Sequence, residues 1–488
     1  MRRGPVVQTA YGKVRGTARD GVTAFLGIPY AAPPFGPNRF RAPRPPEPWD
    51  GIRDAVEHGP TAPKPGYVHP YTLLLDDPVV PGDGCLNLNV WTPGGSGLPV
   101  MVWIHGGAFR NGSGALPVYD GRNFARDGVV CVTINYRLGV EGFAGLPGAP
   151  ANRGLLDQIA ALEWVQANIA AFGGDPGRVT VFGESAGAMS VTTLLSLDLG
   201  LFGRAIAQSG AGAVAQDPDD ALLVTREMAA RLGVEPTAEG FAALDPAAII
   251  PVQSEVATEV AALPDPARWG ATTAACAMSL TPILDGELLR RRPEDAIAGG
   301  AGRDVDLLIG CTSEEFRFFL MPSGLAAQVT EELIGLVAAG MGLPPGVPAA
   351  YRDRRPELAP GELMAAILTD GMFRVPADRA AAGHAASGGR TWMYEFAWRS
   401  PTFDVGACHA LELGFVFDNL TGAPGSLAGS NPPQELADRM HRAWVDFAVR
   451  GDPGWARYEP STRAVQVFDG PGDRVVLDPL GDDRKLWE

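Results

Sequence analysis

The sequence has little lysine, little cysteine and no long hydrophobic run. Only three of its 40 basic residues are lysine, and the arginines are dispersed along the chain. Its formal net charge of −16 argues against nucleic acid as a partner, because phosphate binding needs concentrated lysine and arginine. No stretch reaches the roughly 18 consecutive apolar residues of a membrane span, so we expect no membrane association.

The few cysteines and histidines are also widely separated. Five cysteines occur among 488 residues, with no C-x-x-C pair. A sparse, odd count is typical of free thiols in a reducing compartment rather than of a disulfide framework. No HExxH motif, His/Cys cluster or phosphate-cradling loop is present, so we expect neither a metal nor another cofactor. We therefore predict a cytoplasmic protein.

What the sequence does contain is the composition of a large globular protein, with 46% hydrophobic and 20% charged residues. Short apolar runs alternate with helical periodicity, which indicates an α/β protein with a largely parallel sheet covered by helices. The expected buried strands are residues 99–104, 129–134, 179–182, 204–208, 305–310 and 391–396. Apolar stripes predict helices over residues 155–169 and 436–448.

Two long Ala- and Leu-rich stretches, about 211–280 and 321–390, interrupt this series of strands. Their helix-forming composition predicts helical insertions. Insertions into such a sheet often cover the carboxyl edge of the strands, where ligands bind. We expect them to line a substrate pocket; the alternative is surface helices without ligand contact.

The motif GESAG at residues 183–187 carries a candidate nucleophile. A G-x-S-x-G match alone is weak evidence in a chain with 62 glycines. Its context is stronger, because an expected strand runs into it and residues 188–195 follow as a helix. Together they form a nucleophile elbow, which needs small residues beside the serine. Such a turn projects Ser185 Oγ above the sheet and aims the Ala186 N–H at a developing oxyanion.

The motif HGGAF at residues 105–109 directly follows the expected strand 99–104. A Gly-rich turn after a strand supplies backbone N–H groups that no side chain obstructs, as in the HGGG-type half of an oxyanion hole. We expect Gly107 and Ala108 to be the donors, with Gly106 giving the turn its freedom. An ordinary glycine loop is the alternative.

A catalytic serine needs a base, and the chain has six histidines. His409 lies in a loop after the expected strand 391–396, where the chain order Ser, acid, His calls for the base. The others are His58 and His69 in a Pro-rich stretch, His105 in the glycine loop, His384 at an expected exposed helix end, and His441 in a helical stripe.

The acid should come from a strand end between the serine and the histidine. The expected strand 305–310 is followed closely by Glu314 and Glu315. Their positions alone do not choose between the two carboxylates.

Further motifs resemble the type-B carboxylesterases, a family that includes cholinesterases and bacterial para-nitrobenzyl-type esterases. The resemblance covers nearly the whole chain. It is carried by TAYGKVRG (9–16), FLGIPYA (25–31), CLNLNVW (85–91), NYRLG (135–139), NRGLLDQ (152–158) and FGGDP (172–176). It implies one domain over residues 1–488 with an α/β-hydrolase fold and helical insertions over the active site.

The resemblance also implies a function. In the family, a Glu follows an acidic residue shortly after a strand-end Gly, which assigns Glu315 as the catalytic acid, and His409 matches a His-x-x-Glu segment. The implied protein is a serine carboxylesterase that hydrolyses small-molecule esters through an acyl-enzyme, with the triad Ser185, Glu315 and His409. The same triad could serve an amide, lactone or carbamate hydrolase, and some family members are non-catalytic binding modules. The oligomeric state stays open between a monomer and a weak homodimer.

Three positions depart from the family pattern. Only one acid precedes Cys85, where the family has two, which could loosen a local salt bridge. Cys85 also lacks the upstream cysteine with which the family often pairs it, so we expect a free thiol. Phe316 stands where the family usually has Gly after the acid.

Four residues near these motifs have two interpretations each. Glu184 could tune the field of the pocket or hydrogen-bond to buried backbone. Ser209 resembles a family serine that supports the triad carboxylate, or is a turn serine. Cys311 and Cys408 flank the acid and the base. They could approach each other as a pair whose oxidation inactivates the enzyme, but we expect both to act as small packing groups.

Overall fold

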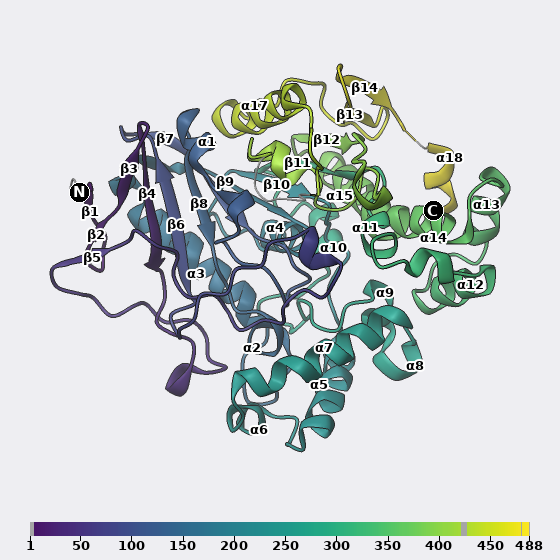
Figure 1. Ribbon diagram of the computed structural model, residues 1–488, viewed down its shortest axis with the longest axis horizontal. Coiled ribbons are helices and arrows are strands. Elements are labelled where there is room, and N and C mark those ends of the chain that lie inside the picture. The colour runs from purple at the N-terminus through teal and green to yellow at the C-terminus, as the bar shows by residue number, and fades with distance from the viewer. Residues whose placement is uncertain (1–3, 421–426, 480, 488) are drawn as a thin grey trace.

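The computed structural model describes residues 4–420, 427–479 and 481–487. A single large sheet crosses these residues, with a small three-stranded sheet beside its N-terminal edge (Figure 1). The small sheet consists of β1 (Val6–Gln8), β2 (Lys13–Arg15) and β5 (Ile52–Asp54). The large sheet consists, in spatial order, of β14 (Arg474–Leu477), β13 (Ala464–Phe468), β12 (Thr391–Phe396), β11 (Asp306–Thr312), β10 (Arg204–Gln208), β9 (Gly174–Glu184), β7 (Leu98–Ile104), β8 (Val130–Ile134), β6 (Asn87–Thr92), β4 (Val22–Pro29) and β3 (Thr17–Arg19).

The centre of the large sheet is parallel and its two edges are antiparallel. Neighbours from β8 across to β13 run parallel, whereas β14 at one edge and β6, β4 and β3 at the other are antiparallel. All six expected strands are present, which confirms the α/β expectation. The antiparallel strands were not predicted, because their short or mixed patterns lack the continuous apolar run of a buried parallel strand.

Helices cover both faces of the sheet, and strand β7 shows how. Val100, Val102 and Ile104 face one hydrophobic cluster, which includes Leu162 of the helix α3 (Arg153–Asn168). Met101 and Trp103 face the other cluster, with Trp444 of the helix α17 (Gln434–Arg450). Because successive side chains of a strand point to opposite faces, a run without polar residues requires apolar cover on both sides.

The helices that pack directly on the sheet include both of those expected. They are α1 (Arg122–Arg126), α3 (Arg153–Asn168), α4 (Ala186–Leu195), α15 (Val375–Ala386) and α17 (Gln434–Arg450). The remaining helices are α2 (Gly139–Phe143), α5 (Pro218–Leu232), α6 (Ala238–Ala242), α7 (Pro246–Ala262), α8 (Pro266–Trp269), α9 (Ala271–Cys276), α10 (Pro293–Ala298), α11 (Arg317–Leu320), α12 (Glu331–Gly340), α13 (Val347–Arg354), α14 (Pro360–Thr369), α16 (Leu413–Val416) and α18 (Gly481–Arg484). Helices α5 to α9 lie within residues 211–280, and α12 to α15 lie within 321–390.

All five cysteines, including Cys85, are buried and free, as expected. Arg39, shortly after the motif at residues 25–31, forms a buried ion pair with Glu141 at 2.6 Å.

No helix within the described residues is both long and apolar enough to cross a bilayer.

Candidate active site

The candidate nucleophile lies in a tight turn between β9 and α4. Ser185 has φ 56° and ψ −125°, a backbone conformation that residues other than glycine rarely adopt. A Cβ on Gly187 would lie 2.0 Å from the Ile104 carbonyl oxygen, and one on Gly183 would lie 2.6 Å from the Gly187 carbonyl carbon. The strand and helix therefore approach so closely that only glycine fits on either side. Ser185 is partly exposed, whereas Glu184 and Ala186 are buried.

The glycine loop after β7 packs against this turn. A Cβ on Gly106 would lie 3.1 Å from Ser185 Cβ. Gly107 and Ala108 have φ values of 113° and 53°, and both are partly exposed beside otherwise buried neighbours. Among the described residues, the N–H groups of Gly107, Ala108 and Ala186 have no acceptor. The turn and the loop thus present unused donors next to the serine.

His105 packs against this loop and forms no ion pair with a described carboxylate. Its Nδ1 lies 2.8 Å from the Gly106 carbonyl oxygen, and its ring stacks on Tyr136 at 4.5 Å. The Tyr136 hydroxyl donates to the His105 carbonyl at 2.8 Å. Burial lowers the pKa of His105 to about 3, so its ring stays neutral.

The candidate acid and base meet at the carboxyl ends of β11 and β12. Glu315 Oε2 lies 2.6 Å from His409 Nδ1, and Glu315 Oε1 accepts a 2.7 Å hydrogen bond from the Thr312 N–H. The backbone N–H of His409 also donates to the Glu315 carbonyl at 3.3 Å. Both side chains are buried, so this carboxylate holds the imidazole in one orientation.

Glu314 is turned toward the backbone of the histidine loop instead. Its Oε2 accepts a 3.0 Å hydrogen bond from the Ala407 N–H, and its own N–H donates to the Ala407 carbonyl at 2.9 Å. Its Oε1 forms an ion pair with Arg399 at 2.8 Å. Glu314 therefore joins the two loops, while Glu315 contacts the imidazole.

Phe316 does not divert the carboxylate beside it. Its ring packs on Phe319 at 4.9 Å, and its N–H donates to Thr369 Oγ1 at 3.0 Å. The rings of Phe319 and Phe373 also pack against the His409 ring, with centroid distances of 5.3 Å and 5.0 Å. The aromatic side chains after the acid thus enclose the imidazole.

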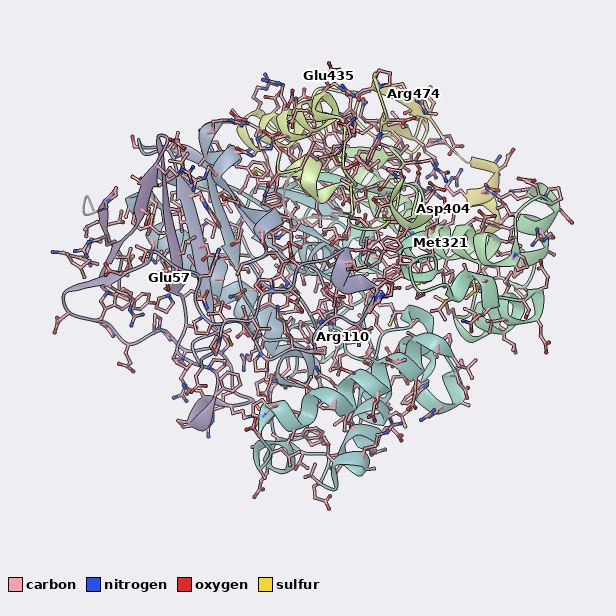
Figure 2. All side chains as sticks on the ribbon, in the orientation of Figure 1. Glu57, Arg110, Met321, Asp404, Glu435 and Arg474 are labelled. Carbon is pink, nitrogen blue, oxygen red and sulfur yellow. The ribbon has the colours of Figure 1, made fainter. Side chains whose placement is uncertain are left out.

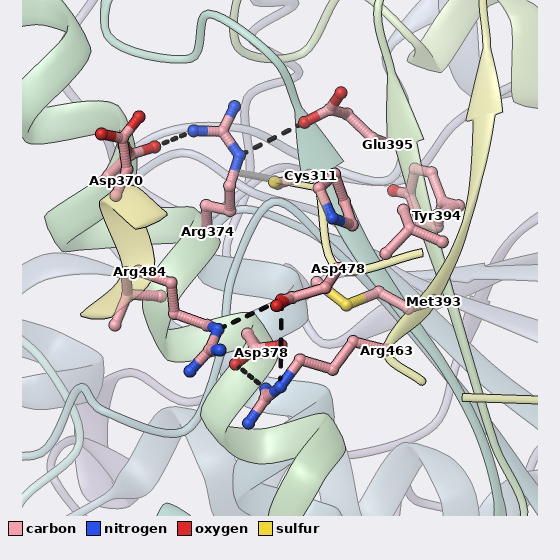
Figure 3. A pocket seen from close by; sticks show the side chains of 14 residues that line it. Cys311, Asp370, Arg374, Asp378, Met393, Tyr394, Glu395, Arg463, Asp478 and Arg484 are labelled. Atoms are coloured by element: carbon pink, nitrogen blue, oxygen red, sulfur yellow. Dashed lines mark hydrogen bonds and ion pairs between the residues drawn. The ribbon is translucent and has the colours of Figure 1, made fainter. Parts of the chain in front are cut away.

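A partly buried arginine, Arg374, lies beside the acid loop and pairs with two carboxylates (Figure 3). Arg374 pairs with Asp370 and with Glu395, and it donates to the Ser313 carbonyl at 2.8 Å. These side chains line a cavity of about 30 Å³, next to Cys311. A space of this size holds about one or two waters. Its lining includes none of Ser185, Glu315 and His409, so it supports the site without forming it.

The serine and the histidine are not hydrogen-bonded to each other among the described contacts. His409 Nε2 lies 3.0 Å from Glu184 Oε1, the residue before the serine. The predicted residues therefore meet in two groups, the serine with the glycine loop and the acid with the base. Glu184, rather than Ser185, forms the contact between the groups.

The chain matches the model of the carboxylesterase family over residues 3–334 and 349–467. It is 38% identical to the para-nitrobenzyl esterase of Bacillus subtilis over 492 residues, covering 95% of this chain and 94% of that protein.

The chain belongs to the carboxylesterase family.

Other relatives agree. The phenmedipham hydrolase of Pseudarthrobacter oxydans is 33% identical over 97% of each chain. The crystal structure of the Geobacillus stearothermophilus carboxylesterase EST55 superposes with a TM-score of 0.87 at 36% identity, covering 99% of this chain and 100% of that one. The α/β-hydrolase fold and the activity class, a carboxylic-ester hydrolase, are thereby confirmed.

In this carboxylesterase, the buried carboxylates of Glu184 and Glu315 lie beside the His409 imidazole. Burial and the nearby Glu315 raise the pKa of Glu184 to about 7, against the opposing effect of His409. Burial lowers the pKa of His409, but the carboxylates of Glu184 and Glu315 outweigh it and raise that pKa to about 9. A proton on this imidazole is therefore held more strongly than in water.

Glu412 is a further buried carboxylate near His409. In the sequence it stood out only as the last residue of the His-x-x-Glu segment. It is fully buried, and its Oε1 accepts a 3.2 Å hydrogen bond from Gln208, which in turn accepts one from Trp444 at 2.9 Å. Burial, Glu184 and Glu315 raise the pKa of Glu412 to about 8. Only its spacing from His409 in the sequence could have indicated this position.

The structure also bears on two further expectations, for Ser209 and His384. Ser209 Oγ is buried and has no partner among the described residues, so no contact to the Glu315 carboxylate supports the first interpretation. His384 was expected at an exposed helix end, which is wrong. It is buried in α15 with Nδ1 2.8 Å from Thr391 Oγ1, because β12 and the glycine turn before it cover that end.

Proposed function

We propose that this carboxylesterase cleaves esters through an acyl-enzyme on Ser185, with His409 as the base and Glu315 as its acidic partner. The 2.6 Å contact between Glu315 Oε2 and His409 Nδ1 carries the proposal. In the neutral imidazole it keeps the proton on Nδ1 and leaves Nε2 as the acceptor that a serine nucleophile requires.

In the proposed reaction, Ser185 Oγ attacks the ester carbonyl carbon as its proton passes to His409 Nε2. The tetrahedral intermediate collapses, the alcohol leaves with that proton, and the acyl group remains on Ser185. Water then attacks the acyl-enzyme, with His409 again taking a proton and returning it to Ser185. The products are the free acid and the alcohol.

The proposed oxyanion hole consists of the N–H groups of Gly107, Ala108 and Ala186. It is supported by the absence of any acceptor for these groups among the described residues, beside a partly exposed serine. Fixed donors stabilise the charge that develops on the carbonyl oxygen, and each is typically worth about 10²- to 10³-fold in rate.

For this reaction, the Ser185 hydroxyl must become the partner of His409 Nε2. Glu184, adjacent in the chain, lies 3.0 Å from that nitrogen, so the required displacement is local. Catalytic hydrogen bonds often tighten only when the substrate is bound.

Labelling with a fluorophosphonate tests the nucleophile directly. We expect stoichiometric labelling of the enzyme and none of Ser185→Ala, together with a fall in para-nitrophenyl ester turnover on the order of 10⁴-fold or more. Ser254→Ala is the matched control, because its hydroxyl bonds only to the Ile250 carbonyl. A burst of para-nitrophenol from folded Ser185→Ala would contradict the proposal.

We further propose a small-molecule ester substrate and a cytoplasmic location, the latter supported by five unpaired cysteines. One domain over residues 1–488, with the insertions 211–280 and 321–390 lining the substrate pocket, remains a prediction. Rates on para-nitrophenyl esters of increasing acyl length would size that pocket.

A further inference from the structure

Arg110, in the turn that closes the glycine loop, is a basic side chain without a partner among the residues that the structure describes. Its backbone N–H donates to the Gly107 carbonyl at 3.0 Å, so it follows the proposed oxyanion donors directly. The side chain is partly buried and lies near the middle of the molecule (Figure 2). Within the described part of the chain, its guanidinium forms no hydrogen bond and no ion pair.

Three basic side chains that are more deeply buried than Arg110 all have partners. Lys64, on the neighbouring segment, pairs with Asp77 and also donates to the Gly112 carbonyl at 3.3 Å. Arg137 forms a 2.6 Å ion pair with Asp157. Arg153 donates to four backbone carbonyls. Arginine keeps its charge in proteins, so a sheltered guanidinium without an acceptor is costly unless something else binds it.

The surroundings of Arg110 contain no competing anion. No described carboxylate lies within ion-pair distance of the guanidinium. Burial lowers the pKa of Arg110, and among the described residues the Tyr67 phenol is the titratable neighbour that acts against this. Burial in turn raises the pKa of Tyr67 well above its usual range, so this phenol is neutral at pH 7. The guanidinium therefore retains its full capacity to bind an anion.

We propose that Arg110 binds a carboxylate that the ester substrate carries away from its scissile bond. The proposal rests on the proposed function, since it uses the position of Arg110 directly after the oxyanion loop. A planar guanidinium matches a carboxylate with two parallel hydrogen bonds, which favours this anion over a neutral group of the same size. The overall charge of −16 steers such esters away weakly, whereas the contact at Arg110 acts at short range.

Paired esters that differ only in this charge test the proposal. On the acyl side, mono-para-nitrophenyl adipate is compared with its methyl ester; on the alcohol side, para-acetoxybenzoate is compared with its methyl ester. We expect Arg110→Gln to lower the anionic-to-neutral ratio of kcat/KM about 10- to 100-fold for one of the two pairs. The pair that responds identifies the side of the ester that bears the charge.

Two further variants control for charge and folding. Arg110→Lys keeps the charge but not the planar fork, and should retain part of the preference. Arg442→Gln removes an exposed arginine of α17 and should leave both ratios as they were. An Arg110→Gln ratio equal to that of the parent enzyme in both pairs, in a variant with an unchanged melting temperature, overturns the proposal.

A binding measurement separates this proposal from the proposed mechanism. The same esters are titrated calorimetrically into Ser185→Ala, with and without Arg110→Gln. We expect the anionic member of the responding pair to bind at least 10-fold more weakly when Arg110 is replaced. Equal affinities would overturn the role of Arg110 even if Ser185 is the nucleophile. Weaker binding would support it even if the fluorophosphonate experiment fails.

Discussion

The two halves of the active site are built by different kinds of interaction. Around Ser185 and the glycine loop, the geometry depends on backbone conformation and on the absence of side chains, as the 2.0 Å approach between Ile104 and a Cβ on Gly187 illustrates. Around His409, it depends on buried charges and aromatic rings brought from distant segments. The first half is fixed by local sterics, and the second by electrostatics in a medium where water is excluded.

The largest effect expected in the charged half comes from Glu315→Gln. The Thr312 N–H donates to Glu315 Oε1, so the amide oxygen of a glutamine should take that place and the amide NH₂ should face His409 Nδ1. The imidazole would then carry its proton on Nε2 and could not accept one from Ser185. We expect kcat to fall about 10³- to 10⁴-fold, measured on para-nitrophenyl acetate.

Unchanged folding is the control for this variant, since glutamine has nearly the shape of glutamate. A kcat within 10-fold of the parent enzyme, measured at the pH optimum of each, would remove Glu315 from the mechanism.

In the backbone half, Gly107→Ala should have the next largest effect. Gly107 has a φ of 113°, and an added Cβ would lie 2.3 Å from the Asn111 carbonyl oxygen, so the loop must shift. Displacement of the proposed donors should lower kcat about 10²- to 10³-fold. Gly335→Ala is the matched control, because its Cβ would meet nothing within 4 Å and its φ is ordinary. Equal rates for the two variants would contradict the proposed oxyanion hole.

The contact between the two halves, from Glu184 to His409, should control the pH dependence. His409 must be neutral to act as a base, so activity rises with pH through its pKa, which its carboxylate neighbours raise to about 9. Glu184→Gln removes a negative charge 3.0 Å from Nε2 and destabilises the imidazolium. The midpoint of the acidic limb of kcat/KM should therefore move to lower pH.

Glu435→Gln, which removes an exposed carboxylate on α17, should leave the midpoint in place. If Glu184→Gln also leaves it in place, Glu184 does not act on the charge of His409.

The same division explains what could be predicted from the sequence. The turn at Ser185 was predictable because the glycines on both sides of the serine form a local sequence motif. The pairing of Glu315 with His409 followed from strand ends and from family resemblance. The contact of Glu184 with Nε2 and the buried state of Glu412 could not be predicted, because they arise only when distant segments meet. The missing partner of Arg110 is likewise visible only when every neighbour is placed.

The smallest effect should come from Glu314→Gln, the matched partner of the Glu315 variant. The amide oxygen can still accept the hydrogen bond from Ala407, so the two loops stay joined, while the ion pairs with Arg399 at 2.8 Å and with Arg317 at 3.8 Å are lost. Arg399 is 59% exposed, and such a pair contributes less than about 1 kcal/mol. We expect kcat to change less than about threefold, because that energy corresponds to a factor of about five at most and acts on the fold rather than on the imidazole. A loss as large as that of Glu315→Gln would mean that the loops, rather than one carboxylate, hold His409, and the division between a steric half and an electrostatic half would no longer stand.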